Sequence, residues 1–414
     1  MALSLIQTPS FVSLSNNYNF IVTDPTTAYS GLTNYYVQYE LVNLQNSTTI
    51  IKDNVNVYNS VYGGYAIYDT HRVLNNYVTY DTAPLLGALG FYSTINNIFH
   101  YGINAYEFTG STLLSSTINI FSGLTILGVV DRNVTFNYVN YIMDGPNKKF
   151  RTNWIYPYYT RKTDRGSLSF AVKDFTSFKY RMRVEIDGNQ IWWSAGTPLT
   201  GNTQDRIQYF GSGYYEVDHT FFTGATGLGF NILSSVSAKT YKMFLVNDGV
   251  GQVIQSPLSE VVKFVVDDSC PLIENIELMW LNEMGAYDFY TFYRERHKEY
   301  KSTKTLFNKK DYGLSNGSLI VPQYSRGEVT LNNNIVTNIS VISKVLDNNM
   351  SKNISGLFTS PEVYWLNNDV TPVEINPITI DMETLEIKDN KNRPDRAIYT
   401  FNFRLSNEKN TITN

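Results

Sequence analysis

The densest cluster of ionisable residues in the sequence is the run RERHKEYK, from Arg294 to Lys301. The side chains of this run can form ion pairs. Their spacing fits no catalytic motif, and because the run mixes positive and negative charges, it differs from the basic stripe that binds nucleic acid. Such a run suits contact with another subunit, where charges fix register more than affinity. A solvated helix face or the end of a strand is the plainer interpretation, and the residues alone leave both open. The candidate inter-subunit contacts are Arg294, Glu295, Arg296, Lys298, Glu299 and Lys301.

Motifs for catalysis, cofactors or metals are missing from the sequence. The four histidines lie outside any HExxH, HxH or Cys/His cluster that would bind zinc: His71, His100, His219 and His297. The single cysteine, Cys270, cannot form an intrachain disulfide or a multi-cysteine metal site. The glycine-rich run Gly224–Gly229 matches neither GxGxxG nor a phosphate-binding P-loop, so we expect a turn or sheet-edge loop there. We therefore expect a protein that is not an enzyme and has no catalytic, cofactor-binding or metal-binding residues, although the sequence alone does not exclude a glycosidase pair of carboxylates.

Composition favours a folded, multidomain, mainly β chain. With 414 residues, 43% hydrophobic and 17% charged, the chain can fill several cores and is not of the disordered class. Aromatic residues make up 14% of it, which favours strands, although an AT-rich genome would also enrich Tyr and Asn. The net charge of −4 gives no reason to expect specific nucleic-acid binding. No apolar run is long enough to cross a bilayer and no secretory signal is present, so we expect synthesis in a cytoplasm and no membrane span.

The charged run is expected to follow a strand pair. Ile276–Leu281 reads as a buried strand, Gly285 as a turn, and Tyr287–Tyr293 as an alternating strand. Farther on, Ile339, Ile342, Val345 and Leu346 follow helical spacing, as do Ile354, Leu357 and Phe358 in a second short helix that Ser360-Pro361 ends. Strands are then expected at Val363–Leu366, Val373–Ile375 and Ala397–Leu405. These elements predict an α+β C-terminal domain over 269–414, with its boundary in the polar break Asp267–Pro271.

The rest of the chain predicts two mainly β domains, over 1–145 and 146–268. In the first, alternation predicts strands at Tyr35–Leu41, Thr49–Val57, Ile103–Phe108 and Thr117–Phe121, with a short helix within Ala66–Val78. In the second, six strands predict a β-sandwich, fibronectin-like because a cysteine pair is missing. They are Ser167–Val172, Tyr180–Ile186, Gln190–Ser194, Tyr214–Phe222, Thr240–Val246 and Val261–Val266, with a hairpin turn at Asp187-Gly188.

Three stretches carry a family resemblance. They are Tyr39–Tyr80, with its Gly-x-Ala-x-x-Asp-x-x-Arg-x-Leu pattern, WLNEMGAYDFYTF (Trp280–Phe292) and GLFTSPEVYWL (Gly356–Leu366). In that order the chain resembles tail- and neck-region virion proteins of Bacteroidetes-infecting tailed phages of the crAss-like podovirus type. The Asn/Ser-rich stretch 313–338 departs from that pattern. The resemblance implies a structural protein of the virion, with no catalytic residues to carry over.

From both lines we expect a ring, adaptor or hub subunit of the phage neck or tail, made of about six or twelve copies joined head to tail. Its expected partners are copies of itself and neighbouring tail, neck or portal proteins, with DNA passing through a central channel as an open possibility. A receptor- or glycan-binding tail protein is the alternative, which the Tyr and Trp content supports and the missing coiled-coil shaft disfavours. An envelope hydrolase is a third class, for which the sequence offers no pocket residues.

Overall fold

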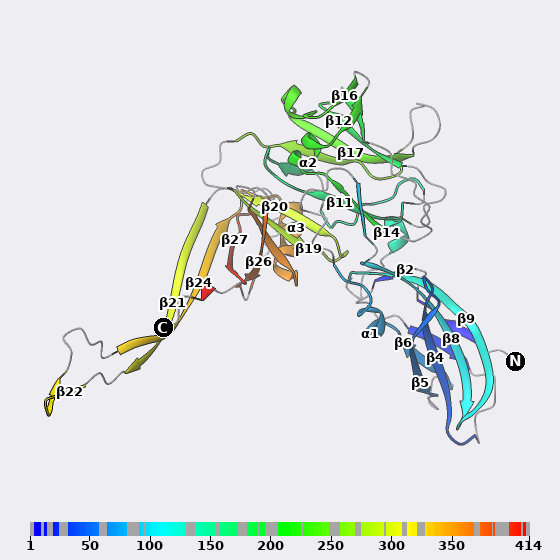
Figure 1. The fold of residues 1–414 in the computed structure, drawn as a ribbon. Coiled ribbons are helices and arrows are strands. Elements are labelled where there is room, and N and C mark those ends of the chain that lie inside the picture. The colour runs from blue at the N-terminus through cyan, green and yellow to red at the C-terminus, as the bar shows by residue number, and fades with distance from the viewer. Residues whose placement is uncertain are drawn as a thin grey trace. The chain divides into compact units, whose positions relative to one another are not determined.

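The computed structural model describes most of the chain, and every structural statement refers to the described residues. These are 4–9, 12–14, 20–24, 32–57, 64–80, 91–94, 96–129, 137–143, 145–154, 157–172, 180–188, 190–194, 206–224, 227–247, 257–269, 275–293, 295–308, 313–320, 328–367, 373–382, 384–385, 397–406 and 409–410. They form two compact units (Figure 1). Unit 1 is Met1–Asp268 with Leu281–Asp288, and unit 2 is Ser269–Trp280 with Phe289–Asn414. The chain is mainly β and multidomain, as expected, whereas the domain boundary at 145/146 stays a prediction.

The first part of unit 1 packs a five-stranded sheet on a three-stranded one. The larger sheet has the order β2 (Val12–Leu14), β9 (Thr112–Ile126), β8 (Ile98–Thr109), β4 (Tyr35–Asn43), β5 (Thr48–Asn56), and the smaller one β1 (Ser4–Gln7), β3 (Phe20–Asp24), β6 (Ala66–Asp69). Between them the rings of Tyr39 and Tyr68 stack at 4.9 Å, and the Tyr39 hydroxyl hydrogen-bonds Thr23 at 2.6 Å. The strand predictions for β4, β5, β8 and β9 are confirmed. The helix expected within Ala66–Val78 is only α1 (His71–Leu74), which follows β6.

The second part of unit 1 is a sandwich. A seven-stranded sheet has the order β10 (Tyr158–Thr160), β18 (Val262–Val266), β17 (Thr240–Asn247), β12 (Tyr180–Ile186), β13 (Gln190–Ser194), β15 (Phe222–Gly224), β16 (Gly227–Gly229). A three-stranded sheet has the order β11 (Ser167–Val172), β14 (Arg206–Gly211), β7 (Phe91–Thr94), and short 3-10 helices span Tyr138–Tyr141 and Ser234–Val236. Both sheets supply one apolar core, which includes Phe170, Phe210, Met182 and Leu245. The expected hairpin at Asp187-Gly188 is confirmed, since β12 pairs with β13 up to Ile186 opposite Gln190, and both Asp187 and Gly188 have positive φ.

One strand prediction in the sandwich is wrong. Tyr214–His219 is a helix, α2, and the strand expected over Tyr214–Phe222 is reduced to its end in β15. Tertiary contacts override the alternating pattern, because Gly213 lies so close to the 164–166 segment that an added Cβ would sit 2.4 Å from the Arg165 carbonyl carbon. Helical geometry then buries the Glu216 carboxylate, which accepts hydrogen bonds from Arg165 and from the backbone N–H of Gly166.

The turn Leu281–Asp288 packs inside unit 1. Gly285 has φ +69°, confirming the expected turn, and a Cβ on it would lie 2.1 Å from the Leu127 carbonyl oxygen. The buried Arg151 guanidinium donates to the carbonyl oxygens of Met284 (2.5 Å) and Leu127 (3.3 Å). Asn282 donates in turn to the Arg151 carbonyl at 3.1 Å. Backbone acceptors therefore hold a charged side chain that is 1% exposed.

Unit 2 contains a large antiparallel sheet, a helix and a separate two-stranded hairpin. Its order is β20 (Tyr287–Phe292), β19 (Ile276–Leu281), β25 (Val363–Asn367), β26 (Glu374–Ile380), β27 (Thr400–Leu405), β24 (Glu328–Ile342), β21 (Glu295–Asn308), with β28 (Lys409–Asn410) also paired to β24. Helix α3 (Asn348–Thr359) confirms the expected second helix and ends at Ser360. Gly356 of α3 lies against the indole of Trp280, where a Cβ would be 3.0 Å from Nε1. Among the described helices, none is long and apolar enough to span a membrane.

Candidate assembly surface

The charged run from Arg294 to Lys301 begins the long strand β21. Arg294 lies outside the described residues, and Glu295 belongs to β21 with its side chain outside them too. Antiparallel pairing with β24 runs the whole length of the strand, from Glu295 opposite Ile342 to Asn308 opposite Glu328. Within the plainer interpretation, the run lies in a strand and the helix face is wrong. Contact of the run with another subunit stays a prediction.

The helix predicted for the segment from Ile339 to Leu346 is also wrong. Ile339 and Ile342 lie in β24, while Val345 and Leu346 follow its end, so no helix covers this segment. Burial in this segment repeats every two residues, as in a strand, because the alternate residues Thr337, Ile339 and Val341 are buried. Sequence reasoning read only the spacing of the largest residues and missed this alternation.

The candidate contacts divide between the two faces of β21. Arg296 and Lys298 are cross-strand partners of the buried Val341 and Ile339, so they share the face that carries the core of unit 2. Arg296 lies over the Trp365 ring at 6.0 Å, and Lys298 lies 5.2 Å from the Tyr300 ring. Glu299 and Lys301 point to the opposite face and are exposed. The strand therefore does not gather these residues into one patch.

Beyond the sheet, β21 and β24 continue as a two-stranded ribbon. β24 pairs with β27 only over Asn338–Ile342 and with β28 at Asn334 and Ile335, so the segment from Glu328 to Asn333 has β21 as its one partner among the described strands. In Figure 1 the two strands run out together past β27 and β26. We call this part, Tyr300–Asn308 with Glu328–Thr337, the shaft.

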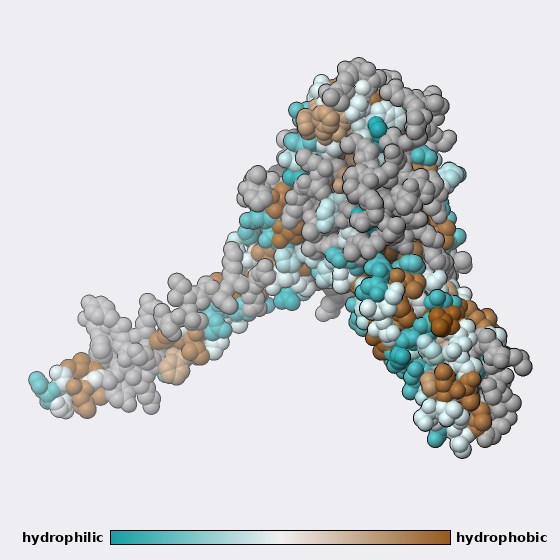
Figure 2. Space-filling view, turned by 45° about the vertical axis from the view of Figure 1, so that its right-hand side comes forward, coloured by the Kyte–Doolittle hydropathy of each residue, from teal (hydrophilic) through white to brown (hydrophobic). Residues whose placement is uncertain are grey.

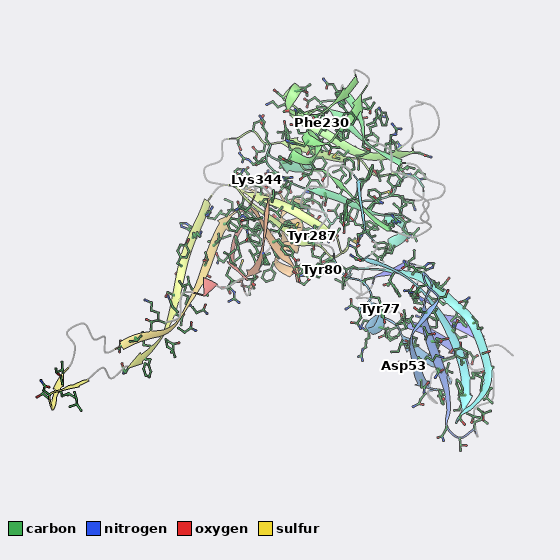
Figure 3. All side chains as sticks on the ribbon, viewed as in Figure 1. Asp53, Tyr77, Tyr80, Phe230, Tyr287 and Lys344 are labelled. Atoms are coloured by element: carbon green, nitrogen blue, oxygen red, sulfur yellow. The ribbon has the colours of Figure 1, made fainter. Side chains whose placement is uncertain are left out.

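The shaft exposes apolar side chains on both faces. Leu306 and Phe307 are adjacent in sequence and therefore point to opposite faces, and both are more than half exposed, as are Tyr300 and Leu331. Figure 3 shows side chains standing on both sides of the ribbon. A two-stranded ribbon is at best marginally stable in water, and exposed apolar side chains in such an element indicate an interaction surface. β21 is the edge strand of its sheet. Its lysines Lys298, Lys301 and Lys304 disfavour indiscriminate pairing of this edge with other strands.

A small hairpin lies between the two shaft strands in the sequence. β22 (Gly313–Ser315) pairs with β23 (Ser318–Ile320) through Asn316 and Gly317, whose φ values of 52° and 78° fit a type I′ turn. We call this hairpin the tip. Its Leu314 and Leu319 are cross-strand partners, 78% and 63% exposed. Sequence reasoning treated this stretch only as Asn/Ser-rich, although the Asn-Gly dipeptide between apolar residues was a usable hairpin signal.

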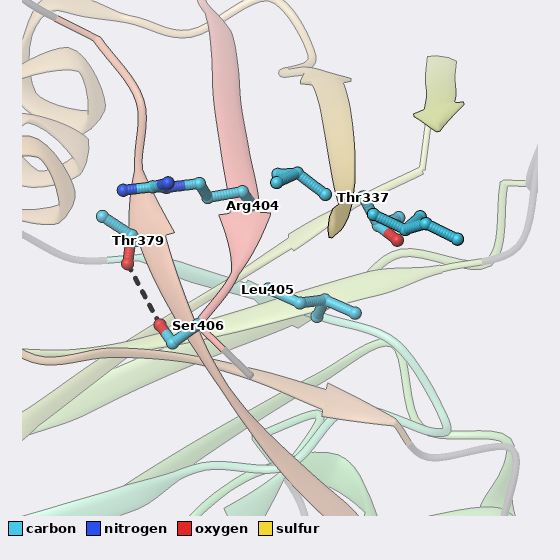
Figure 4. A pocket seen from close by; sticks show the side chains of 7 residues that line it. Thr337, Thr379, Arg404, Leu405 and Ser406 are labelled. Carbon is cyan, nitrogen blue, oxygen red and sulfur yellow. Dashed lines mark hydrogen bonds between the residues drawn. The ribbon is translucent and has the colours of Figure 1, made fainter. Parts of the chain in front are cut away.

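A hollow of about 160 Å³ lies beside the root of the ribbon (Figure 4). Its lining residues are Ile335, Val336, Thr337, Thr379, Arg404, Leu405 and Ser406. The hydroxyls of Thr379 and Ser406 point toward one another and are 3.0 Å apart. The hollow is smaller than the roughly 300 Å³ expected of a ligand site, and its lining includes no carboxylate, histidine or cysteine.

Titratable groups elsewhere have structural partners. His71 Nδ1 lies 2.7 Å from Asp69, and His219 Nδ1 lies 2.8 Å from the Tyr215 carbonyl. Within the described part of the chain no cluster of three His, Cys, Asp or Glu residues could hold a metal ion. Cys270 lies outside the described residues. Gly224 ends β15 and Gly227–Gly229 form β16, and these strands pair at the edge of the seven-stranded sheet. The predicted turn between them lies outside the described residues.

No protein-family model matches the chain, and no curated protein matches it in sequence. The shaft and the tip together form a long, exposed and partly apolar projection of unit 2 (Figure 2, brown patches at lower left).

Proposed function

We propose that this chain is a structural protein that assembles with copies of itself, with the shaft of each copy packing on a neighbour. The observation that carries the proposal is the shaft itself, in which β21 and β24 pair with one another and expose Tyr300, Leu306, Phe307 and Leu331. Burying one such side chain contributes about 1.5–3 kcal/mol. A neighbour that covered both faces would supply the stability that a lone ribbon lacks.

Charge supports a second copy as the neighbour. The segment 294–342 holds eight Lys and Arg against four Asp and Glu, a net charge of +4. The whole chain has 33 against 37, so the remainder has 25 against 33, a net charge of −8. A basic projection on an otherwise acidic chain is attracted to the body of another copy, and the attraction favours correct orientation during encounter.

The two surfaces in such a contact differ, so the association is heterologous. Heterologous contacts form closed rings when the rotation between copies closes, and open filaments when it does not. Together with the resemblance to crAss-like phage tail proteins, this supports a ring, adaptor or hub subunit of a virion neck or tail, of about six or twelve copies. In that setting its partners are neighbouring tail, neck or portal proteins, its location is the virion, and the ring lumen would let DNA pass.

The mass and symmetry of the purified protein test the proposal. Native mass spectrometry and electron microscopy should find rings, and Leu306→Ser with Phe307→Ser should lower the mass to that of a monomer. Lys242→Glu with Lys263→Glu is the matched control, since these exposed partners lie on β17 and β18. The control should leave the mass unchanged. A wild-type protein that stays monomeric at every concentration, or a shaft variant that still assembles, would contradict the proposal.

One observation favours the alternative of a receptor- or glycan-binding tail protein. The rings of Phe221 and Phe230 lie 5.1 Å apart on unit 1, and the two residues are 42% and 58% exposed (Phe230 is marked in Figure 3). Exposed aromatic faces can stack on sugar rings. A trimer that binds glycans, and loses that binding on Phe230→Ala, would support this alternative over a ring. A monomer with hydrolytic turnover would support the enzyme class instead.

A further inference from the structure

The five-stranded sheet of unit 1 has an outward face with a regular pattern of side chains. In β4, Val37, Tyr39 and Leu41 are buried in the core, so the residues that alternate with them point outward. β5, β4 and β8 lie side by side (Figure 1). Their outward residues form three cross-strand rows, which together we call the outer face: Asn56, Tyr36 and Phe108; Asn54, Gln38 and Tyr106; Lys52, Glu40 and Asn104.

The first row contains a pair of aromatic rings. Tyr36 and Phe108 are cross-strand partners, and their rings stack with centroids 5.3 Å apart and planes 12° apart. Both residues are only half-buried, so part of each ring remains accessible. Aromatic faces carry partial negative charge, and the C–H groups of a sugar ring can pack against them. We call these two residues the aromatic pair.

The second row contains two primary amides. Gln38 Nε2 donates to Asn54 Oδ1 at 2.9 Å, and Asn54 is exposed. Each amide has one acceptor oxygen and two donor hydrogens. This bond therefore leaves an acceptor on one amide and two donors on the other for a ligand. Because sugar hydroxyls both donate and accept, they can bond to both sides of this amide pair.

The third row neutralises its own charges. Glu40 is 6% exposed, and each of its carboxylate oxygens has two partners. They are Thr49 (2.7 Å) and Lys52 (3.2 Å) on one oxygen, and Asn104 (3.0 Å) and Tyr106 (2.7 Å) on the other. A carboxylate that is paired in this way has no need of a further cation. The outer face therefore has no net charge, which favours an uncharged ligand.

We propose that the outer face binds a neutral polysaccharide, with the C–H groups of the sugar against the aromatic pair and its hydroxyls bonded to the amide pair. Aromatic surface combined with a few fixed polar groups is the usual composition of a ligand site. The buried Glu40 network fixes the strands beneath that surface, so little order must be gained on binding.

A polysaccharide fits the outer face better than a protein partner does. Three rows two residues apart and three strands span roughly 13 Å by 10 Å, an area of roughly 130 Å². A stable protein interface covers about 800 Å² on each partner. The outer face belongs to unit 1 and the shaft to unit 2, so this binding is a function additional to the proposed assembly.

Affinity electrophoresis of the full-length protein tests the proposal. Native gels contain a β-glucan, a mannan, a xylan or a galactan, with alginate as the charged comparison. At least one neutral polysaccharide should retard the wild type more than alginate does. Tyr36→Ala with Phe108→Ala should weaken this binding about tenfold or more, and so should Gln38→Ala with Asn54→Ala.

Two further variants serve as controls. Phe221→Ala with Phe230→Ala removes two exposed rings of unit 1 outside the outer face, and should change the binding less than about twofold. Tyr36→Phe keeps the ring and should bind nearly as well as the wild type. Circular dichroism checks folding, and the amide variant should be folded because Gln38 and Asn54 lie outside the core. It therefore decides the outcome if the aromatic variant does not fold.

Four results would overturn the proposal: a wild type that no neutral polysaccharide retards, retardation by alginate alone, an amide variant retarded as strongly as the wild type, or equal loss in the Phe221 and Phe230 control. The last result would place sugar binding at those two rings instead. The ring is tested separately by mass, since a monomer that binds polysaccharide through the outer face would refute the ring and leave this site standing.

Discussion

Thr152 and Asp288, 136 residues apart in the sequence, are joined by a hydrogen bond of 2.5 Å from the threonine Oγ1 to the carboxylate Oδ1. Asp288 is 2% exposed, and burial raises the pKa of its carboxyl group from 3.8 to about 6, although hydrogen bonds from Thr152 and Asn282 act in the opposite direction. Ionisation of the buried Asp288 carboxyl group therefore costs free energy in the folded chain.

The first prediction concerns Asp288→Asn. Because the folded-state pKa is raised, the folded chain binds this proton more tightly than the unfolded chain does. The stabilising contribution is therefore complete below the unfolded pKa of about 3.9 and is lost as pH rises through about 6. Asn keeps an acceptor for Thr152 and cannot ionise. Thermal unfolding from pH 4.5 to 7.5 should show a steeper fall in Tm for the wild type than for the variant.

In the Asp288→Asn variant, Tm should still fall as pH rises, because Glu216 also has a raised pKa. Burial raises the pKa of its carboxyl to about 7, against the lowering effect of Arg165, so it acts in the same direction as Asp288. Glu40 differs: although burial raises its pKa, hydrogen bonds from Asn104, Thr49, Tyr106 and Lys52 lower it to about 2. Its contribution is lost only as pH falls below about 4.5, outside the measured window. Identical slopes for wild type and Asp288→Asn would show that Asp288 titrates normally.

The second prediction compares two glycines of unit 1 that share a left-handed backbone. Gly285 has φ +69° and no room for a Cβ, which would lie 2.1 Å from the Leu127 carbonyl oxygen. Gly188 has φ +77° and nothing within 4 Å. Gly188→Ala should cost only the backbone strain, about 1–2 kcal/mol, and Gly285→Ala more than about 3 kcal/mol because the turn must also move. Chemical denaturation measures both, and equal losses would mean that the close approach to Leu127 is not maintained in solution.

The third prediction concerns the start of α3. The Asp347 carboxylate accepts from the backbone N–H of Met350 at 2.7 Å, a side-chain cap that satisfies a donor the helix leaves open. Asp347→Ala should lower the free energy of unfolding by about 1 kcal/mol. Asp347→Asn keeps the acceptor and should cost much less. Urea denaturation followed through far-UV circular dichroism distinguishes the two, and a large loss for both would point to the charge instead of the cap.

Strands with uninterrupted alternation were predictable, and their reasons are local. Tyr180–Ile186 alternates buried and half-buried residues, and its ends coincide with those of β12 because Asp187-Gly188 fixes the turn. Tyr214–His219 and Ile339–Leu346 were predicted wrongly, since contacts with Gly166 and with the neighbouring strands decide between helix and strand there. The shaft was beyond sequence reasoning for another reason. Nothing in Thr303–Asn308 reveals that the strand continues past its own sheet, because that depends on where β27 ends.

The final prediction separates the shaft from the tip. Asn308 and Glu328 are directly paired, so a two-residue Asn-Gly turn can replace residues 309–327 and close the shaft as a hairpin. This variant keeps the apolar faces of the shaft and loses the tip. It should fold with a Tm within about 2 °C of the wild type and assemble to the same mass, as measured by native mass spectrometry. Loss of assembly would mean that the contact between copies uses the segment 309–327 and not the shaft alone.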